Sequence, residues 1–268
     1  MKITKVEVMS KAIKLNEPLV ISLGRIDFAM SAVVHIHTDE GFIGVGEGAP
    51  GILITGETLE GTVSCIQKIG EALIGCDPLD FEKIYFTMNT IAAHAPSAKT
   101  AIDIAIHDII GKASNQAISQ LFGGYRTSIE TDMTLGIGAP EEMAKKAKTH
   151  IATGFDTLKV KVGVDERLDV ERIKQIREAV GSSVKIRVDA NQGWLPKQAV
   201  KMIERLDEYD IELVEQPVKA ADITGLKFVR EHSKALIMAD ESCFTAADAL
   251  KLIRAEAIDL INIKLMKC

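Results

Sequence analysis

The chain has 268 residues, of which 47% are apolar, so it can form one large domain or two modest ones around a sizeable core. Its net charge of −6 is spread without a basic face, which excludes the electrostatic footprint of a nucleic-acid-binding protein. The start of the chain lacks the apolar core of a signal peptide, and no apolar run approaches the ~20 residues of a membrane span, so we expect a cytoplasmic globular protein with no membrane partner.

Four cysteines occur along the chain. Cys65, Cys76, Cys243 and Cys268 show no CxxC pair and no regular spacing. A zinc site or a disulfide framework therefore has little support, and we expect reduced thiols.

The first part of the chain is predicted to be an α+β unit. Residues 1–48 alternate polar and apolar side chains in the manner of antiparallel strands. From about residue 59 to 122 the apolar spacing becomes helical, and two glycines end that segment. We take residues 1–125 as one domain.

A glycine-rich stretch within this domain fits a well-known nucleotide-binding pattern. Residues Gly44 to Ala49 read G-x-G-x-x-A and follow a predicted strand. A dinucleotide fingerprint requires a helix directly afterwards, with its N-terminus on the pyrophosphate. Pro50 and Gly51 follow instead, so we interpret the stretch as the end of the sheet.

The remaining residues, 126–268, alternate short β-rich runs with amphipathic helices, which is typical of parallel strands. Six runs are predicted to be strands: SIETDMTLGI, TLKVKVG, VKIRVDAN, IELVEQP, LIMADES and LINIKL. The helix ends carry typical capping residues: Pro140 and Pro196 at starts, Gly154 and Gly181 at stops, and Thr245 with Asp248 as a capping box.

One charged residue recurs at the end of five of these runs. The residues stand at intervals of 24 to 28 positions: Lys161, Asp189, Glu215, Asp240 and Lys264. In a (β/α)₈ barrel of the TIM type the carboxyl ends of the strands converge on one mouth, where catalytic groups are collected from several strands. An open sheet would keep them apart, so the spacing favours the barrel.

Strand alternation places charges and apolar side chains on opposite faces of the predicted strands. Lys159 and Lys161 share one face of TLKVKVG, and Asp189 and Lys264 lie on the corresponding faces of their own runs. If the apolar faces meet the helices, the charges point into the barrel. Barrel interiors are normally filled with branched apolar residues, so charges there suggest chemistry.

Three carboxylates at successive strand ends suit a metal ion. Asp189, Glu215 and Asp240 form an all-oxygen set that fits Mg²⁺, and Mn²⁺ could substitute. The alternative is that they are helix N-caps and loop carboxylates, which commonly follow strands in α/β folds.

Two lysines are predicted on opposite walls of the barrel. Lys161 and Lys264 lie on the second and sixth runs, so a substrate held by the metal would sit between two amines. That arrangement suits removal of a proton from one face of a carbon and its return on the other. Nearby cations lower the pKa of a lysine base, whereas Lys159 would stay charged and stabilise an enolate. Alternatively, the lysines only pair with the carboxylates and hold the mouth together.

These residues carry a family resemblance over essentially the whole chain. TLKVKVG, VDANQGW, VEQPV, MADES and INIKLMK resemble, in order and spacing, the muconate-lactonising branch of the enolase superfamily. GILITGE around Ile54 and ETDMTLGI, which contains Thr134, look most like the dipeptide epimerases. The resemblance implies a Mg²⁺-dependent isomerase that inverts the α-carbon of the C-terminal residue of a dipeptide through an enolate.

The resemblance also assigns roles to residues. It implies that residues 1–125 form a capping domain whose loops near 19–28 and 51–57 close over the substrate, and a homo-oligomer is expected. The implied roles are metal ligation by Asp189, Glu215 and Asp240, acid-base catalysis by Lys161 and Lys264 with Lys159 beside them, and substrate contacts at Arg25, Ile54 and Thr134.

The sequence departs from the family in two places. Glutamate-specific relatives are expected to carry an arginine in the first capping loop, where this chain has Gly24 with Arg25 next to it, so the preferred side chain is not defined. The chain also stops after the sixth predicted strand, short of the ~250 residues of a barrel and without the family's Asp-x-Asp pair for the dipeptide ammonium group. We expect a truncation, with weak or absent activity of the chain by itself.

Several other functions fit the same residues. N-acylamino-acid racemase, o-succinylbenzoate synthase and muconate cycloisomerase chemistry all begin with a metal-stabilised enolate. From a different class, the chain could be an inactive remnant that binds Mg²⁺ or a small anion. A lysine that forms a Schiff base is a third option, against which the three carboxylates argue.

Overall fold

The computed structural model describes residues 1–267 and divides into two compact units. The first unit comprises residues 1–15 and 28–129, together with the segment that begins at Lys264. The second unit comprises residues 16–27 and 130–263. The predicted domain boundary between residues 125 and 126 stays a prediction.

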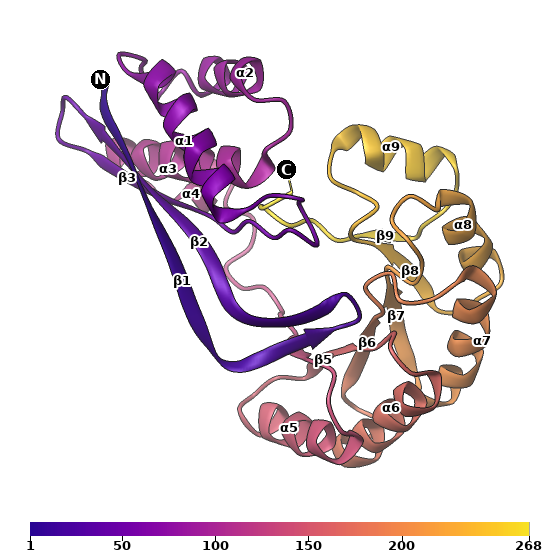
Figure 1. The fold of residues 1–268 in the computed structure, drawn as a ribbon. Coiled ribbons are helices and arrows are strands. Elements are labelled where there is room, and N and C mark those ends of the chain that lie inside the picture. Colours follow the sequence, from indigo (N-terminus) through magenta and orange to yellow (C-terminus); the bar gives the residue numbers. More distant parts are fainter. Residues whose placement is uncertain (268) are drawn as a thin grey trace. The chain divides into compact units, whose positions relative to one another are not determined.

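The first unit combines a three-stranded sheet with four helices (Figure 1). The strands lie in the order β1-β2-β3, and β2 pairs with β3 in antiparallel register, as predicted. Residues 19–28, predicted to be a loop, are mostly strand on both sides of a short turn, and all but the last of them belong to the second unit. The elements are β1 (Ile3–Ile21), β2 (Gly24–Thr38), β3 (Ile43–Gly48), α1 (Leu59–Leu73), α2 (Phe81–Ile91), α3 (Pro96–Ser114) and α4 (Ile118–Leu121).

The glycine-rich stretch of this unit is a packing surface. Gly44, Gly46 and Gly48 alternate along the buried face of β3 and lie against α3. A Cβ at Gly46 would lie 1.9 Å from the carbonyl oxygen of Ala101, so only glycine allows this approach. The next helix begins only at Leu59, so the stretch lacks the helix that a dinucleotide fingerprint requires.

The second unit contains a parallel six-stranded sheet in the order β4-β5-β6-β7-β8-β9 (Figure 1). The strands are β4 (Met133–Leu135), β5 (Thr157–Lys161), β6 (Lys185–Asp189), β7 (Ile211–Glu215), β8 (Leu236–Ala239) and β9 (Leu260–Ile261). Between them lie α5 (Pro140–Ala152), α6 (Glu166–Val180), α7 (Pro196–Leu206), the short 3₁₀ helix η1 (Asp207–Tyr209), α8 (Ile223–Glu231) and α9 (Ala246–Arg254). This is the strand-helix order of the predicted barrel, and the sheet is not closed within the described residues.

Capping residues define the helix ends of this unit as predicted. Pro140 and Pro196 are the first residues of α5 and α7. Gly181 follows α6 with φ of 80°, in the left-handed region that favours glycine. Thr245 and Asp248 form the predicted capping box of α9.

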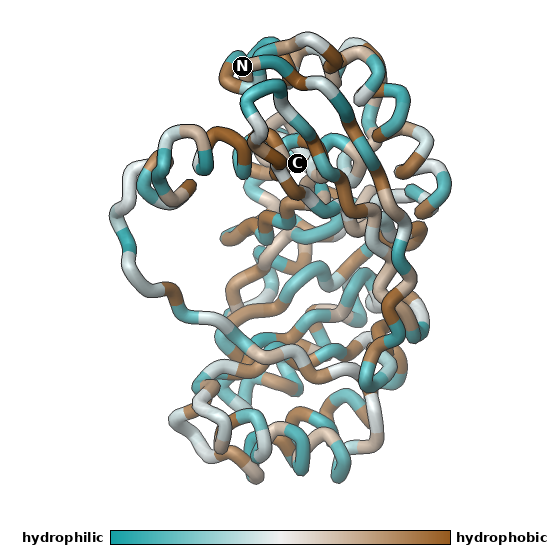
Figure 2. The backbone as a smooth tube through the Cα atoms, turned by 90° about the vertical axis from the view of Figure 1, so that its left-hand side faces the viewer, coloured by the Kyte–Doolittle hydropathy of each residue, from teal (hydrophilic) through white to brown (hydrophobic). Residues whose placement is uncertain are grey.

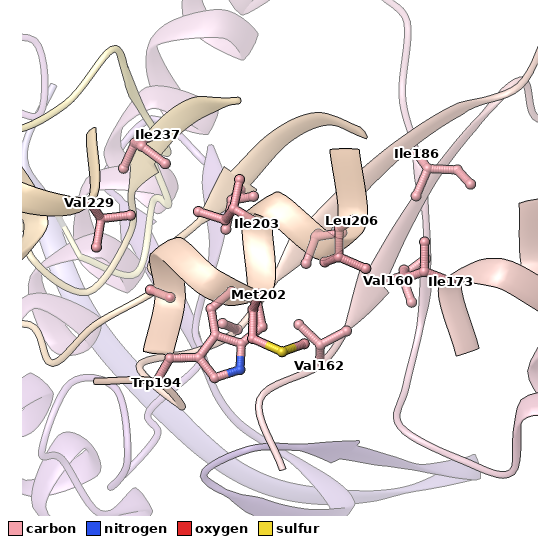
Figure 3. Packing of buried hydrophobic residues seen from close by; sticks show 14 of the residues in the cluster. Val160, Val162, Ile173, Ile186, Trp194, Met202, Ile203, Leu206, Val229 and Ile237 are labelled. Atoms are coloured by element: carbon pink, nitrogen blue, oxygen red, sulfur yellow. The ribbon is translucent and has the colours of Figure 1, made fainter. Parts of the chain in front are cut away.

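The core of the second unit lies between one face of the sheet and the helices. Figure 3 shows Val160 and Ile186 of the sheet near Ile173 of α6, and Met202 of α7 beside Val162 and Trp194. This packing confirms that the apolar faces of β5 and β6 meet the helices. Ile263 and Leu265, expected on the corresponding face of the sixth predicted strand, are exposed instead. Hydrophobic and hydrophilic residues alternate along the tube in Figure 2, as expected for elements with one buried face.

Two further observations concern the whole described chain. Every helix among residues 1–267 is too short or too polar to cross a membrane. Cys65 and Cys76 are partly exposed and Cys243 is buried, whereas Cys268 lies outside the described residues.

Candidate metal and acid-base site

Four of the predicted residues gather where the parallel strands of the second unit end. Lys161, Asp189 and Glu215 are the last residues of β5, β6 and β7, and Asp240 directly follows β8. The ladder places Lys161 beside Asp189 and Asp189 beside Glu215. Because parallel strands end at the same edge of the sheet, alternation along each strand is enough to bring these side chains together.

The three carboxylates form a compact, buried cluster. One oxygen from each of Asp189, Glu215 and Asp240 lies within 4.8 Å of the others, and all three side chains are buried. Only oxygen donors are present, which is the set that Mg²⁺ prefers, so these residues fit the ion. None of them caps a helix, since the N-caps of α7, α8 and α9 are Leu195, Asp222 and Thr245, and this excludes the N-cap interpretation.

Two lysines of β5 pair with this cluster. The Nζ atom of Lys159 lies 2.9 Å from Asp189 Oδ2 and 2.6 Å from Glu215 Oε2. The Nζ atom of Lys161 lies 2.6 Å from the same Asp189 oxygen. The lysines therefore partly neutralise the charges of the buried carboxylates. Both the catalytic and the purely structural interpretation of the lysines require this pairing.

The electrostatics of the cluster distinguish its members. Burial opposes the charge of Lys159, but Asp189 and Glu215 outweigh it and raise the pKa of the lysine. Burial likewise opposes the charge of Asp189, yet Lys161 and Lys159 lower its pKa. The pKa of Glu215 is raised by burial and by the charge of Asp189. These two carboxylates therefore favour the charged form of Lys159, and its role beside an enolate stays a prediction.

The sequence patterns do not single out the amide side chains that support this cluster. Asn191 Oδ1 accepts a hydrogen bond from Lys161 Nζ at 2.8 Å, and Asn191 Nδ2 donates to Glu241 Oε1 at 3.0 Å. Asn262 Nδ2 donates to Glu215 Oε1 at 2.7 Å. Their position in the sequence could have indicated Asn191 and Glu241, since both lie within two residues of predicted metal ligands.

Gln216 ties two strand ends together. Its Oε1 atom accepts hydrogen bonds from the backbone N–H groups of Asp240 and Ser242, at 2.9 and 3.0 Å. Its φ of 37° is in the left-handed region, which is uncommon for residues other than glycine. Gln216 therefore fixes the backbone that carries Asp240 relative to the end of β7.

A cavity of about 390 Å³ lies over the inner face of the sheet next to the cluster. The predicted substrate residue Thr134 lines it together with Lys159 and Glu215. The complete lining is Asp132, Thr134, Lys159, Arg187, Leu213, Glu215, Met238, Ile261, Asn262 and Ile263. A small molecule in this cavity would contact both the carboxylate cluster and one of its lysines.

The other two predicted substrate residues lie elsewhere. Arg25 stands at the start of β2 with an exposed side chain that pairs with Asp27 at 2.9 Å. Ile54 lies in a turn of the first unit, where its backbone N–H donates to the carbonyl of Gly51. Their substrate contacts stay predictions.

Lys264 does not lie on a strand, which corrects the prediction for LINIKL. β9 ends at Ile261, and the ladder with β8 contains only two residue pairs. Beyond it, the side chain of Asn262 bonds to Glu215, and the carbonyl of Leu265 accepts a hydrogen bond from Thr100 of the first unit. Because the segment from Lys264 belongs to the first unit, the opposition of Lys264 to Lys161 stays a prediction.

Known proteins resemble the chain along its whole length. Residues 3–123 match the mandelate racemase/muconate lactonizing enzyme N-terminal domain, and residues 142–268 match the enolase C-terminal domain-like family. The hydrophobic dipeptide epimerase of Enterococcus faecalis is 54% identical over all of this chain and 76% of its own length. The L-Ala-D/L-Glu epimerase of Bacillus subtilis is 41% identical over all of this chain and 74% of its own length.

A solved structure shows the same architecture. The dipeptide epimerase of Enterococcus faecalis, complexed with Mg and the dipeptide L-Leu-L-Tyr, matches with a TM-score of 0.98 and 54% identity. The match covers all of this chain and 76% of that one.

Proposed function

The chain belongs to the mandelate racemase/muconate lactonizing enzyme family of the enolase superfamily, and on this basis we propose that it epimerises dipeptides at the α-carbon of the C-terminal residue with Mg²⁺ as cofactor. The observation that carries the proposal is the buried cluster of three carboxylates with two paired lysines at adjacent strand ends. Similarity to dipeptide epimerases supports the reaction and the substrate class.

The metal would be held by Asp189, Glu215 and Asp240, whose oxygen atoms are close enough to share one ion. Mg²⁺ bound there supplies electrostatic stabilisation for the negative charge that develops on the substrate carboxylate when the α-proton leaves. The positive charge of Lys159 adds to that stabilisation from the wall of the cavity.

The proton transfers are assigned to the two lysines. In its neutral form Lys161 removes the α-proton of one epimer, and Lys264 delivers a proton to the opposite face of the carbon. In the reverse direction the two lysines exchange roles, since each step must follow the same path backwards. The assignment of Lys264 rests on the family resemblance and on its order along the chain.

Apolar dipeptides are the proposed substrates. The relative with 54% identity acts on hydrophobic dipeptides, which supports the same preference here. Arg25 is already paired with Asp27 and so is a weak partner for an acidic side chain of a substrate. Thr134 and the apolar lining of the cavity, Leu213 and Met238, are the proposed neighbours of the dipeptide.

Proton NMR in D₂O tests the proposal directly. The protein with Mg²⁺ is incubated with a panel of L,L-dipeptides, using both this chain and the full reading frame of its gene. We expect the α-proton signal of the C-terminal residue to disappear while an L,D-diastereomer grows, and both changes to stop with EDTA. No exchange by either protein would overturn the proposal, and N-acylamino acids and succinylbenzoate precursors would then be tested.

We further propose a cytoplasmic location and a homo-oligomeric state. Exposed aromatic side chains of the first unit, such as Phe86 and Phe122, supply apolar surface of the kind that subunit contacts use. Cell fractionation checks the location, and sedimentation equilibrium checks the oligomeric state.

A further inference from the structure

We propose that Glu241 is a positioning residue for Lys161 and acts through the side-chain amide of Asn191. This inference rests on the proposed function, because it concerns how the lysine base is aimed. Glu241, Asn191 and Lys161 form a continuous hydrogen-bonded chain: Glu241 Oε1 accepts from Asn191 Nδ2 at 3.0 Å, and Asn191 Oδ1 accepts from Lys161 Nζ at 2.8 Å. All three side chains are buried.

Glu241 determines which end of the amide faces the lysine. An amide side chain has a donor end and an acceptor end of nearly equal shape, and its partners decide between them. The Glu241 oxygen attracts the NH₂ end, which leaves the carbonyl end for Lys161. Without Glu241 the amide could turn, and its NH₂ group would then face the Nζ atom.

The backbone of Asn191 is held independently of this side-chain contact. Its N–H donates to Asp189 Oδ1 at 2.9 Å, and its carbonyl accepts from Ser22 Oγ at 2.8 Å. Its φ of 40° is in the left-handed region, where asparagine is tolerated better than most residues. The amide can therefore rotate, but the residue that carries it stays in place.

The consequence for Lys161 follows from the geometry of an amine. A neutral lysine amine has two N–H groups and one lone pair in a tetrahedral arrangement. Asp189 Oδ2 at 2.6 Å and Asn191 Oδ1 at 2.8 Å are acceptors for both N–H groups. The lone pair then points in the one remaining direction. The Asn191 amide therefore fixes the orientation of the Lys161 lone pair before substrate binds.

A second observation supports a functional reason for Glu241. Its other oxygen, Oε2, is buried and makes no hydrogen bond to any described atom. Buried polar atoms without partners are rare because desolvating them is unfavourable. An apolar residue would avoid this penalty, but it could not hold the Asn191 amide.

The test compares the two epimers of one dipeptide, each incubated separately in D₂O with Mg²⁺. A variant without the base, Lys161→Met, identifies the epimer whose α-proton exchange depends on Lys161. We expect Glu241→Leu to slow exchange of that epimer at least tenfold more than exchange of the other. Glu241→Gln, which keeps an acceptor for Asn191, should restore the rate to within about threefold. An equal loss for both epimers would overturn the proposal.

A double-mutant cycle tests the route through Asn191. Glycine tolerates the backbone conformation at this position, so Asn191→Gly removes the amide with little strain. Asn191→Gly should reproduce the epimer-selective loss of exchange. This variant therefore tests the proposal even if Glu241→Leu does not fold. In the Asn191→Gly background, Glu241→Leu should have less than a twofold further effect. A second tenfold loss would mean that Glu241 acts by another route and would overturn the proposal.

Mn²⁺ titration of each variant separates positioning from damage to the metal ligands. We expect the Mn²⁺ affinity of each variant to stay within twofold of the wild type. A selective loss of affinity in Glu241→Leu would overturn the proposal, because it would mean that the substitution displaces the metal ligand Asp240. If neither this chain nor the full reading frame of its gene exchanges either epimer of any dipeptide, the proposed function itself fails, and that result is distinct from the others.

Discussion

The contact between β3 and α3 and the charged strand ends of the second unit both bury residues that tolerate little change, but for opposite reasons. At Gly44 and Gly46 there is no space for a side chain. At Lys159 and Asp189 there is space, but each charge depends on its neighbours. Changes at the glycines should therefore lower stability under all conditions, whereas changes at the charges should depend on the cation and the substrate.

The largest effect is expected for Lys161→Met, which removes a base without leaving a hole. Loss of a general acid-base group typically lowers the rate by about 10²–10⁴-fold. We expect epimerisation of dipeptides to fall by that range while the urea midpoint of the Mg²⁺-loaded protein changes little. A matched control is Lys185→Met, because Lys185 is exposed and distant from the carboxylate cluster along its strand. A rate close to that of the wild type would refute the catalytic role of Lys161.

The next effect is on stability and concerns the glycine contact. Gly46→Ala places a Cβ 1.9 Å from the carbonyl oxygen of Ala101, so backbone has to move. Overpacking of this kind costs about 3 kcal/mol of unfolding free energy. Urea denaturation measures it, with Gly138→Ala as control, since a Cβ there meets its nearest neighbour, Met143, at 3.6 Å. Equal stability of the two variants would contradict the claim that the contact between β3 and α3 leaves no space for a side chain.

Lys159→Met tests the charged strand ends, because its effect on the free energy of unfolding should depend on bound metal. The lysine pairs with Asp189 and Glu215, and losing hydrogen bonds to buried charged groups costs about 2 kcal/mol. Mg²⁺ can supply the missing positive charge, so the loss should be large in EDTA and should shrink in Mg²⁺. Urea denaturation under both conditions measures it. A loss that is the same with and without Mg²⁺ would argue for a purely structural ion network.

The smallest effect is expected at the start of α9. Thr245 accepts a hydrogen bond from the Asp248 N–H at 3.2 Å, and Asp248 Oδ2 accepts from the Thr245 N–H at 3.1 Å. Thr245→Ala should cost about 1 kcal/mol, and Thr245→Ser should be close to neutral. Thermal unfolding measures both, and an alanine variant as stable as the serine variant would show that the cap contributes nothing.

The strand ends could be predicted from sequence because they depend on two regular quantities. Alternation along each strand fixes the face, and the repeat of strand and helix fixes the distance between successive ends. Lys161, Asp189, Glu215 and Asp240 follow from these alone. Lys264 did not, because LINIKL has the composition of a strand whereas its ladder ends after two residue pairs.

Contacts between distant or irregular parts could not be predicted. The sequence predicts that the glycines of β3 end a sheet, whereas glycine is required there because the backbone of α3, far along the chain, lies directly against the strand. The chain from Lys161 through Asn191 to Glu241 depends on side-chain rotation and on a left-handed backbone at Asn191. Neither property leaves a periodic signal in the sequence.

The most direct test of the two-base account is epimer-resolved deuterium exchange by Lys161→Met and Lys264→Met, measured side by side with Mg²⁺. Each variant should still exchange the α-proton of one epimer, and the two variants should retain opposite epimers, while neither interconverts them. If both variants lose exchange of the same epimer, or if Lys264→Met behaves as the wild type, the assignment of two opposed lysines is wrong.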